Sequence, residues 1–221
     1  MKKNKISKNW INKQRRDTYV RQSKVDGYRA RSAYKLIEID EKFKVFKGGI
    51  SVIDIGAAPG SWSQYASKVV KNGTIISIDL KKMEKIKNTI QIEGDFTEPN
   101  IQQKIKKNLN NPIDVVMSDM AVNTTGIKDV DAIQTGELCK EAMVFSKDVM
   151  SEKGIFIAKI FMGRSFNEIV ALGKKIFKEV KVFKPKSSRK DSKESFIICK
   201  NLIIYFSPGL IKSDCRIIEG G

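Results

Sequence analysis

The chain has 221 residues, of which 41% are hydrophobic and 30% charged, and its formal net charge is +17. This length suits one α/β domain with a short extension and a core that needs neither disulfides nor metal. No apolar run reaches membrane-spanning length, so we expect no membrane association. The sequence holds no histidine, which excludes a histidine base and the commonest metal ligand; we therefore expect no metal site.

Basic residues gather at the start of the chain. Residues 1–35 contain twelve Lys and Arg side chains but only two acids, Asp17 and Asp26. Trp10, Tyr19 and Tyr28 are interleaved with these charges, and aromatic rings can stack on unpaired bases. We expect residues 1–30 to be a basic arm with little regular structure that contacts nucleic acid through phosphates. The alternative is a solvated tail that aids solubility.

The expected compartment follows from the N-terminus and the cysteines. No apolar segment follows the first lysines, so the N-terminus does not resemble a secretory signal. Cys139, Cys199 and Cys215 form no CxxC pair, and we interpret them as small hydrophobic residues in a reducing compartment. We predict a cytoplasmic protein that is a monomer. A mitochondrial presequence stays open, because the N-terminus is rich in Lys and poor in acids.

From residue 32 onward, helical and strand patterns alternate. A first helix is predicted over residues 32–43, with Ser32 as its cap. Further helices are predicted at 60–71, 98–109, 133–151 and 165–178. Buried strands are predicted at Ser51–Ile55, Thr74–Asp79, Ile90–Ile92, Ile113–Ser118 and Gly154–Ile160. This alternation is typical of a parallel, doubly wound α/β sheet with right-handed crossovers.

Two more strands, at Val180–Lys184 and Ser195–Ile204, follow without a helix between them. Neighbouring strands that lack a crossover helix pair antiparallel, so the last strand is expected to run backwards along the sheet edge. The prediction is a Rossmann-like sheet of seven strands, mostly parallel, with an antiparallel last strand. We expect this domain to span residues 31–206, followed by a tail, 207–221, whose role the sequence does not indicate.

Polar residues stand at the ends of the predicted strands. Ligands bind outside the carboxyl ends of strands in such sheets, and the reversed last strand brings its start to the same rim. The loop from Gly56 to Gly60 has neither the GxGxxG spacing nor the GK[ST] of a P-loop. Asp79, 23 residues after Gly56, can accept both hydroxyls of a ribose. These features predict an adenosine-bearing ligand without a pyrophosphate.

Four motifs, in this order, resemble the FtsJ/RrmJ family of ribose 2′-O-methyltransferases over about residues 26–205. They are DIGAAPGSWSQ (54–64), MSDMA (117–121), IAKIF (157–161) and KPKSSR (184–189). Within the family, they are most similar to the bacterial and organellar branch that methylates a uridine of large-subunit ribosomal RNA. The resemblance implies a methyltransferase fold, S-adenosylmethionine as cofactor, and ribosomal RNA of the large subunit as partner in the bacterial cytoplasm.

The resemblance also implies site residues. The Lys-Asp-Lys-Glu tetrad of the family falls on Lys35, Asp119, Lys159 and Glu194. The implied cofactor contacts are Gly60, Trp62, Asp79, Asp95 and Asp119. We add Gly56, the first glycine of the loop, to this set. The sequence departs from the family at Ser61, where a second glycine is usual, and at Val122, where proline is common. Both departures concern cofactor affinity.

The implied base is Lys159, because a lysine can take a proton from a ribose hydroxyl when burial or nearby cations favour its neutral form. Lys35 and the cofactor sulfonium would be two such cations. Three alternatives stay open: a tRNA or cap ribose methyltransferase, a methyltransferase for a small molecule or protein side chain, and a relative that binds RNA without catalysis. The basic arm argues against the second, and the intact tetrad argues against the third.

Overall fold

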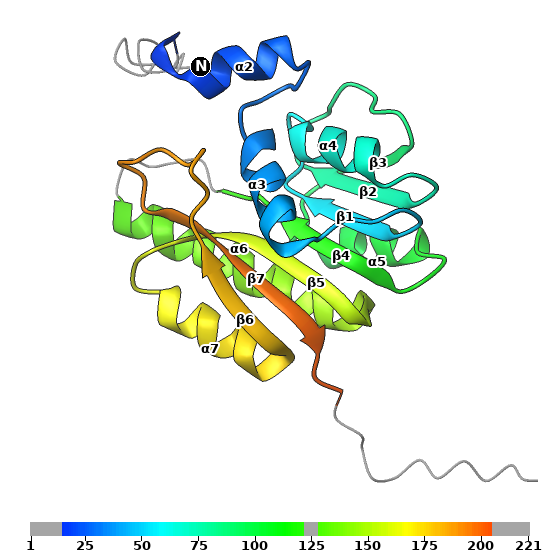
Figure 1. The fold of residues 1–221 in the computed structure, drawn as a ribbon. Helices are drawn as coiled ribbons and strands as arrows, with labels where there is room; N and C mark the ends of the chain where they lie inside the picture. Colours follow the sequence, from blue (N-terminus) through cyan, green and yellow to red (C-terminus); the bar gives the residue numbers. More distant parts are fainter. Residues whose placement is uncertain (1–14, 122–127, 205–221) are drawn as a thin grey trace, which may run out of the picture.

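The computed structural model describes residues 15–121 and 128–204. Figure 1 shows a single sheet with helices on both faces, and α2 at one end of the domain, apart from these layers. The expected tail 207–221, as well as Trp10, Val122 and Cys215, lies outside the described residues. The helices are α2 (Thr18–Val25), α3 (Ala33–Phe43), α4 (Ser61–Val69), α5 (Pro99–Lys107), α6 (Lys128–Val149) and α7 (Phe166–Ile176). The strands are β1 (Ser51–Ile55), β2 (Thr74–Asp79), β3 (Thr89–Glu93), β4 (Ile113–Ser118), β5 (Met150–Phe161), β6 (Phe177–Phe183) and β7 (Glu194–Leu202).

The sheet has seven strands in the order β3-β2-β1-β4-β5-β7-β6. The first five are parallel to one another and β7 pairs antiparallel with β6, both as predicted; β7 also pairs antiparallel with β5. The predicted place of the last strand is wrong, because β7 lies inside the sheet and β6 forms the edge. The apolar run Phe196–Cys199 is buried, whereas Lys178, Glu179 and Lys181 keep β6 exposed. Charged side chains are typical of an edge strand.

Two hydrophobic cores lie on opposite faces of the sheet. Helices α3 and α4 cover one core through residues such as Leu36, Ile39 and Trp62. Helices α5, α6 and α7 cover the other core, which contains Ile105 and Met143. The apolar strands are therefore buried on both faces, which is why their sequences form continuous apolar runs. No helix in the two described ranges is long and apolar enough to cross a membrane.

The N-terminal segment is more ordered than its charge suggested. Residues 17–26 form the capped helix α2, so the prediction of little regular structure is wrong there. Asp17 caps α2, because its carboxylate accepts a hydrogen bond from the backbone N–H of Tyr19 at 3.1 Å. The Tyr19 ring then packs on Tyr34 of α3, with 5.3 Å between centroids. Residues 1–14 lie outside the described part of the chain.

Helix α3 begins as predicted, but its expected cap does not form. The Ser32 side chain makes no capping hydrogen bond. Its hydroxyl instead lies 2.6 Å from the Ser61 hydroxyl at the start of α4. The Ser32 carbonyl also accepts a hydrogen bond from the Trp62 indole at 2.9 Å. Ser32 therefore joins the segment before α3 to the glycine loop instead of capping the start of α3.

Candidate active site

Strand register brings three predicted site residues to one face of the sheet. Met117, Ile157 and Phe196 belong to the core under α3 and α4. Side chains two positions apart along a strand point to the same face. Asp119 and Lys159 each lie two residues after such a core residue, and Glu194 lies two residues before one. Because β7 is antiparallel, all three side chains meet at the rim that α3 covers.

The first pair at this rim is Lys159 with Asp119. The Lys159 ammonium lies 2.9 Å from Asp119 Oδ1 and donates to the Asp119 carbonyl at 2.7 Å. Lys159 is only 8% exposed, and it interrupts an otherwise apolar stretch of β5 that continues with Ile160 and Phe161. A lysine is rarely this buried unless it is paired. The strand thus presents one nitrogen atom at a fixed position.

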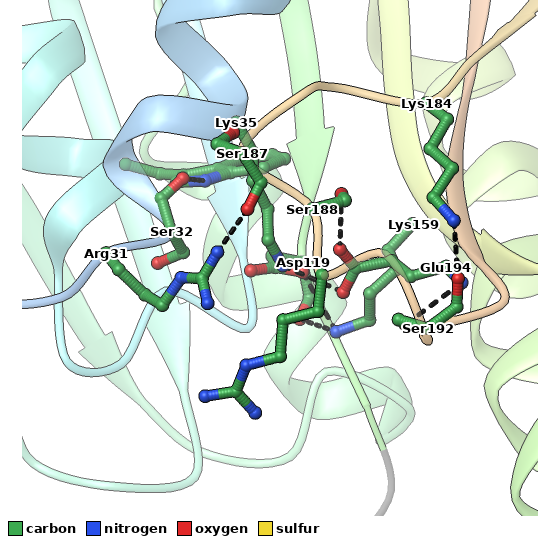
Figure 2. Close-up of polar contacts among 12 residues, drawn as sticks. Arg31, Ser32, Lys35, Asp119, Lys159, Lys184, Ser187, Ser188, Ser192 and Glu194 are labelled. Carbon is green, nitrogen blue, oxygen red and sulfur yellow. Dashed lines mark hydrogen bonds and ion pairs between the residues drawn. The ribbon is translucent and has the colours of Figure 1, made fainter. Parts of the chain in front are cut away.

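The second pair is Lys35 with Glu194. Helix α3 directs Lys35 towards the start of β7, where its ammonium donates to Glu194 Oε2 at 2.7 Å. The Ser188 hydroxyl donates to the other oxygen, Oε1, at 2.9 Å (Figure 2). Both carboxylate oxygens of Glu194 are therefore engaged. The structure thus brings together all four residues of the predicted tetrad as two ion pairs.

The two pairs influence each other electrostatically. Burial alone would raise the pKa of Asp119, but the ammonium groups of Lys159 and Lys35 outweigh burial and hold that pKa below its usual value. Asp119 is consequently ionised at neutral pH. Two cations thus face two carboxylates, which limits the net charge that the protein buries at this rim.

The segment between β6 and β7 is held on the site by residues that sequence reasoning missed. Glu38 of α3 accepts hydrogen bonds from the backbone N–H groups of Lys186 and Ser187, at 2.6 and 2.8 Å. Arg31 donates to the Ser187 carbonyl and to the Asp17 carboxylate. These contacts place Ser188 against Glu194. Glu38 lies three positions after Lys35 on the same helix, and this spacing is the only local signal for it.

A cavity of about 630 Å³ opens beside Asp119, within the usual range for small-molecule sites. Four of the residues predicted to contact the cofactor line it: Gly56, Asp79, Asp95 and Asp119. Its apolar lining includes Ile78, Leu80, Phe96, Met120 and Leu138. Gly56 has a φ of 75°, and a Cβ there would lie 2.5 Å from Met120 Cγ. Only glycine fits where the first loop passes Met120.

The cavity fits an adenosine-bearing cation. Asp79 accepts backbone hydrogen bonds from Ala58 and Lys81, at 2.9 and 2.8 Å, which leaves lone pairs on both oxygens for a ribose. Asp95 is fixed by the amide and hydroxyl of Thr97, at 2.9 and 2.7 Å. These carboxylates suit the hydroxyl, amino and sulfonium groups of a ligand, and the apolar wall suits its adenine ring. Within the described residues, no group of three or more His, Cys, Asp or Glu side chains could hold a metal.

Two predicted cofactor residues do not line this cavity. Trp62 is buried in the core, where its ring packs on Phe196 with 5.7 Å between centroids. Gly60 lies at the start of α4 with a φ of 106°, next to the Arg29 side chain. Ser61 is also buried and faces Ser32. The structure thus gives these three positions roles in holding the glycine loop.

A buried acid lies beneath the glycine loop and was missed as a separate feature. Asp54 of β1 accepts a hydrogen bond from the Ser63 hydroxyl at 2.6 Å, and Ser63 in turn lies 2.7 Å from the Ser77 hydroxyl. Asp54 Oδ1 has no hydrogen-bond partner in the described structure. Burial raises the pKa of Asp54 to about 7, and the Asp119 and Asp79 charges add to this rise.

The chain matches a family model described as FtsJ-like methyltransferase over residues 28–202. It is 75% identical over 202 residues to "Ribosomal RNA large subunit methyltransferase E" of Pelagibacter ubique, covering 91% of this chain and all of the relative. The Rickettsia rickettsii protein of the same name is 45% identical and is covered over 88% of both chains.

A solved structure is also similar to this chain. The crystal structure described as a ribosomal RNA methyltransferase from Plasmodium falciparum superposes with a TM-score of 0.70 at 33% identity, over 79% of this chain and 98% of that one. The family model covers most of the chain, including the cavity and all four tetrad residues. The chain therefore belongs to the FtsJ-like methyltransferase family.

Proposed function

We propose that the chain transfers a methyl group from S-adenosylmethionine to a ribose 2′-hydroxyl of large-subunit ribosomal RNA, with a uridine as the target nucleotide. The observation that carries this proposal is the position of the buried Lys159–Asp119 pair beside a cavity with an acidic and apolar lining. The names of the two bacterial relatives support the choice of RNA.

In this proposal Lys159 is the general base. When bound, S-adenosylmethionine supplies a methyl group that its sulfonium makes electrophilic. Lys159 Nζ takes the proton of the ribose hydroxyl as that oxygen accepts the methyl group. A cation beside an ammonium group favours the loss of its proton. Asp119 holds Lys159 at 2.9 Å and so fixes the direction from which the hydroxyl approaches.

Lys35 and Glu194 complete the site as a second, substrate-facing pair. The Lys35 ammonium keeps donors free beyond its bond to Glu194, and it can direct one of them at the ribose or its phosphate. Glu194 is locked by Lys35 and Ser188 and therefore sets the orientation of Lys35. We assign binding and orientation of the target nucleotide to this pair.

We further propose that the N-terminal segment contacts RNA, and that the assembled large subunit is the substrate of a monomeric enzyme in the bacterial cytoplasm. Arg15, Arg16, Arg21 and Lys24 are all exposed, at or next to α2, while Asp17 and Tyr19 face inward. These four cations can neutralise phosphates without breaking any hydrogen bond or ion pair shown within the described residues.

The decisive test compares wild-type protein with Lys159→Ala and with Lys153→Ala, an exposed lysine on the same strand. Single-turnover methyl transfer is measured on free ribosomal RNA, intact large subunits and tRNA. The modified nucleotide is then mapped by its resistance to alkaline cleavage. We expect Lys159→Ala to lower the rate by about two to four orders of magnitude, while cofactor affinity and the Lys153→Ala rate stay near wild type.

Near wild-type transfer by Lys159→Ala would remove Lys159 as the base. Transfer to tRNA in preference to large subunits would favour the tRNA branch of the family instead. S-adenosylmethionine binding without transfer to any of the three RNAs would favour a relative that binds RNA without catalysis.

A further inference from the structure

Arg29 joins two loops that are far apart in the sequence. Its Nη1 donates to the carbonyls of Pro59 and Glu84, at 3.1 and 3.0 Å, and its Nη2 donates to the carbonyl of Lys85 at 3.2 Å. The backbone N–H of Arg29 also donates to Gln64 Oε1 of α4 at 2.8 Å. The Arg29 side chain is only 18% exposed. Most of its hydrogen-bonding capacity is therefore directed at the protein itself.

The loops that Arg29 joins form adjacent parts of the cavity wall. Ala58, next to Pro59, lines the cavity, and so do Leu80 and Lys81 at the start of segment 80–88. This segment contains no helix or strand. Gln91 of β3 also holds it, by donating to the same Glu84 carbonyl at 3.0 Å. The planar fork of arginine can reach carbonyls on both loops at once, whereas the single ammonium nitrogen of lysine cannot reproduce that fork.

Gly60 leaves room for this arginine. A Cβ at position 60 would lie 2.8 Å from Arg29 Nη1 and 2.7 Å from Ile86 Cδ1. Gly60 also has a φ of 106°, a backbone angle that residues with a side chain rarely adopt. Gly60 therefore affects the cavity through Arg29 and Ile86, although it does not line the cavity itself.

We propose that Arg29 is a positioning residue for the cofactor: it holds the glycine loop and segment 80–88 at the separation that S-adenosylmethionine requires. This inference rests on the proposed placement of the cofactor in the cavity. It assigns to the N-terminal segment a role beyond RNA contact, because that segment also ties the cavity wall together. Arg31, two residues later, makes its contacts with Asp17 and Ser187 instead.

The test compares Arg29→Lys and Arg29→Gln with two controls. Arg21→Gln removes an exposed positive charge from the same segment, and Arg31→Lys changes an arginine whose partners, Asp17 and Ser187, do not line the cavity. Both serve as controls for cofactor affinity alone, because Arg21 is assigned to RNA contact and Arg31 holds the segment next to Glu194. The Kd for S-adenosylmethionine is measured by calorimetry. The KM for S-adenosylmethionine and the kcat are measured with RNA as the methyl acceptor. We expect both Arg29 variants to raise the cofactor Kd and KM by roughly tenfold, the effect of losing about one hydrogen bond from a charged donor. Their kcat at saturating cofactor should stay within about twofold of wild type.

Charge alone predicts a different pattern, in which Arg29→Lys binds the cofactor like wild type and only Arg29→Gln is weakened. That pattern, or wild-type affinity in both variants, would overturn the proposal. Thermal unfolding without cofactor identifies a variant that fails to fold, and Arg29→Lys then carries the test alone. A lowered kcat with unchanged KM would indicate a partly inactive preparation and would also count against positioning. If Asp79→Ala retains affinity as well, the placement of the cofactor fails, and not only the role of Arg29.

Discussion

Asp79 orders the backbone of the cavity and leaves acceptor capacity for a ligand. One oxygen accepts from Ala58 in the glycine loop and the other from Lys81 in the next loop. Each oxygen keeps a lone pair directed elsewhere. A single carboxylate at the end of β2 therefore sets the geometry of two loops as well as the chemistry of a ribose site.

We expect Asp79→Ala to weaken S-adenosylmethionine binding by about 1.5–3 kcal/mol, because the ligand loses a charged acceptor and the loops lose their anchor. Asp79→Asn should cost less, since it keeps the shape and one acceptor. Calorimetric titration with the cofactor measures both effects. Glu93→Gln, which removes an exposed charge from the end of neighbouring β3, is the matched control and should bind normally. An unchanged Kd for Asp79→Ala would show that Asp79 does not contact the ligand.

Individual residues differ in how well sequence alone reveals their roles. Asp79, Asp119 and Lys159 interrupt or end apolar strands, and this position predicts the rim of a parallel sheet. Trp62 was assigned by its motif alone, and the structure places it in the core. Arg29 and Glu38 bind backbone groups 55 and 148 positions away, and no local pattern encodes such contacts.

Asp54, Ser63 and Ser77 join β1, α4 and β2 beneath the glycine loop. Because burial raises the pKa of Asp54 to about 7, the folded protein holds this proton more tightly than the unfolded chain does. The stability that comes from the protonated carboxyl is complete below the unfolded pKa of about 4. It decreases as pH rises and is lost once pH passes about 7.

We therefore expect Asp54→Asn to flatten the pH dependence of stability. Asn is neutral at every pH, so the stability of the variant relative to wild type should rise by roughly 2 kcal/mol between pH 5 and pH 8. Urea unfolding at both pH values gives this difference. Asp148→Asn, at an exposed position on α6, controls for net charge. A difference that does not change with pH would mean that Asp54 is ionised throughout this range.

The elements were more predictable than their arrangement. Strands β1, β2 and β4 have the predicted bounds, because apolar runs between turns define buried strands. The start of β5 at Met150 was missed, since a helical pattern runs directly into it. Helix α2 was hidden by its charge, although Asp17 followed by Thr18 and Tyr19 is a local capping signal. The order β5-β7-β6 was not predicted, although the charges of β6 suit an edge strand and the apolar run of β7 suits a strand that is buried on both faces.

The whole molecule combines a basic N-terminus with a site at one rim of the sheet. Residues 1–14 contain five lysines and no acid, whereas residues 17–31 are tied to the domain by Asp17, Tyr19, Arg29 and Arg31. The expected arm over residues 1–30 therefore divides into a basic part and a part that is tied to the domain. If the two proposals hold, deleting residues 1–30 disturbs the cofactor cavity through the loss of Arg29 as well as RNA binding.

We expect deletion of residues 1–14 to weaken RNA binding and to reduce the slope of log affinity against log salt by up to about 3.5, because five lysines no longer release counterions. Cofactor affinity should not change. Binding of a ribosomal RNA fragment at several salt concentrations gives the slope. Full-length protein with these lysines replaced by Arg should keep the slope, and replacement by Gln should reproduce the deletion. Equal slopes for full-length and shortened protein would identify residues 1–14 as an inert tail.

The position of β7 inside the sheet also affects how the protein is made. Translation produces β6 before β7, yet β6 reaches the sheet only by pairing with β7. Until then, the growing chain exposes the unpaired edge of β5, and unpaired strand edges favour aggregation. Glu194, the partner of Lys35, is also synthesised 159 residues after it. A nascent chain therefore completes its tetrad only when synthesis of the domain is nearly finished, so a prematurely terminated chain cannot carry a working site.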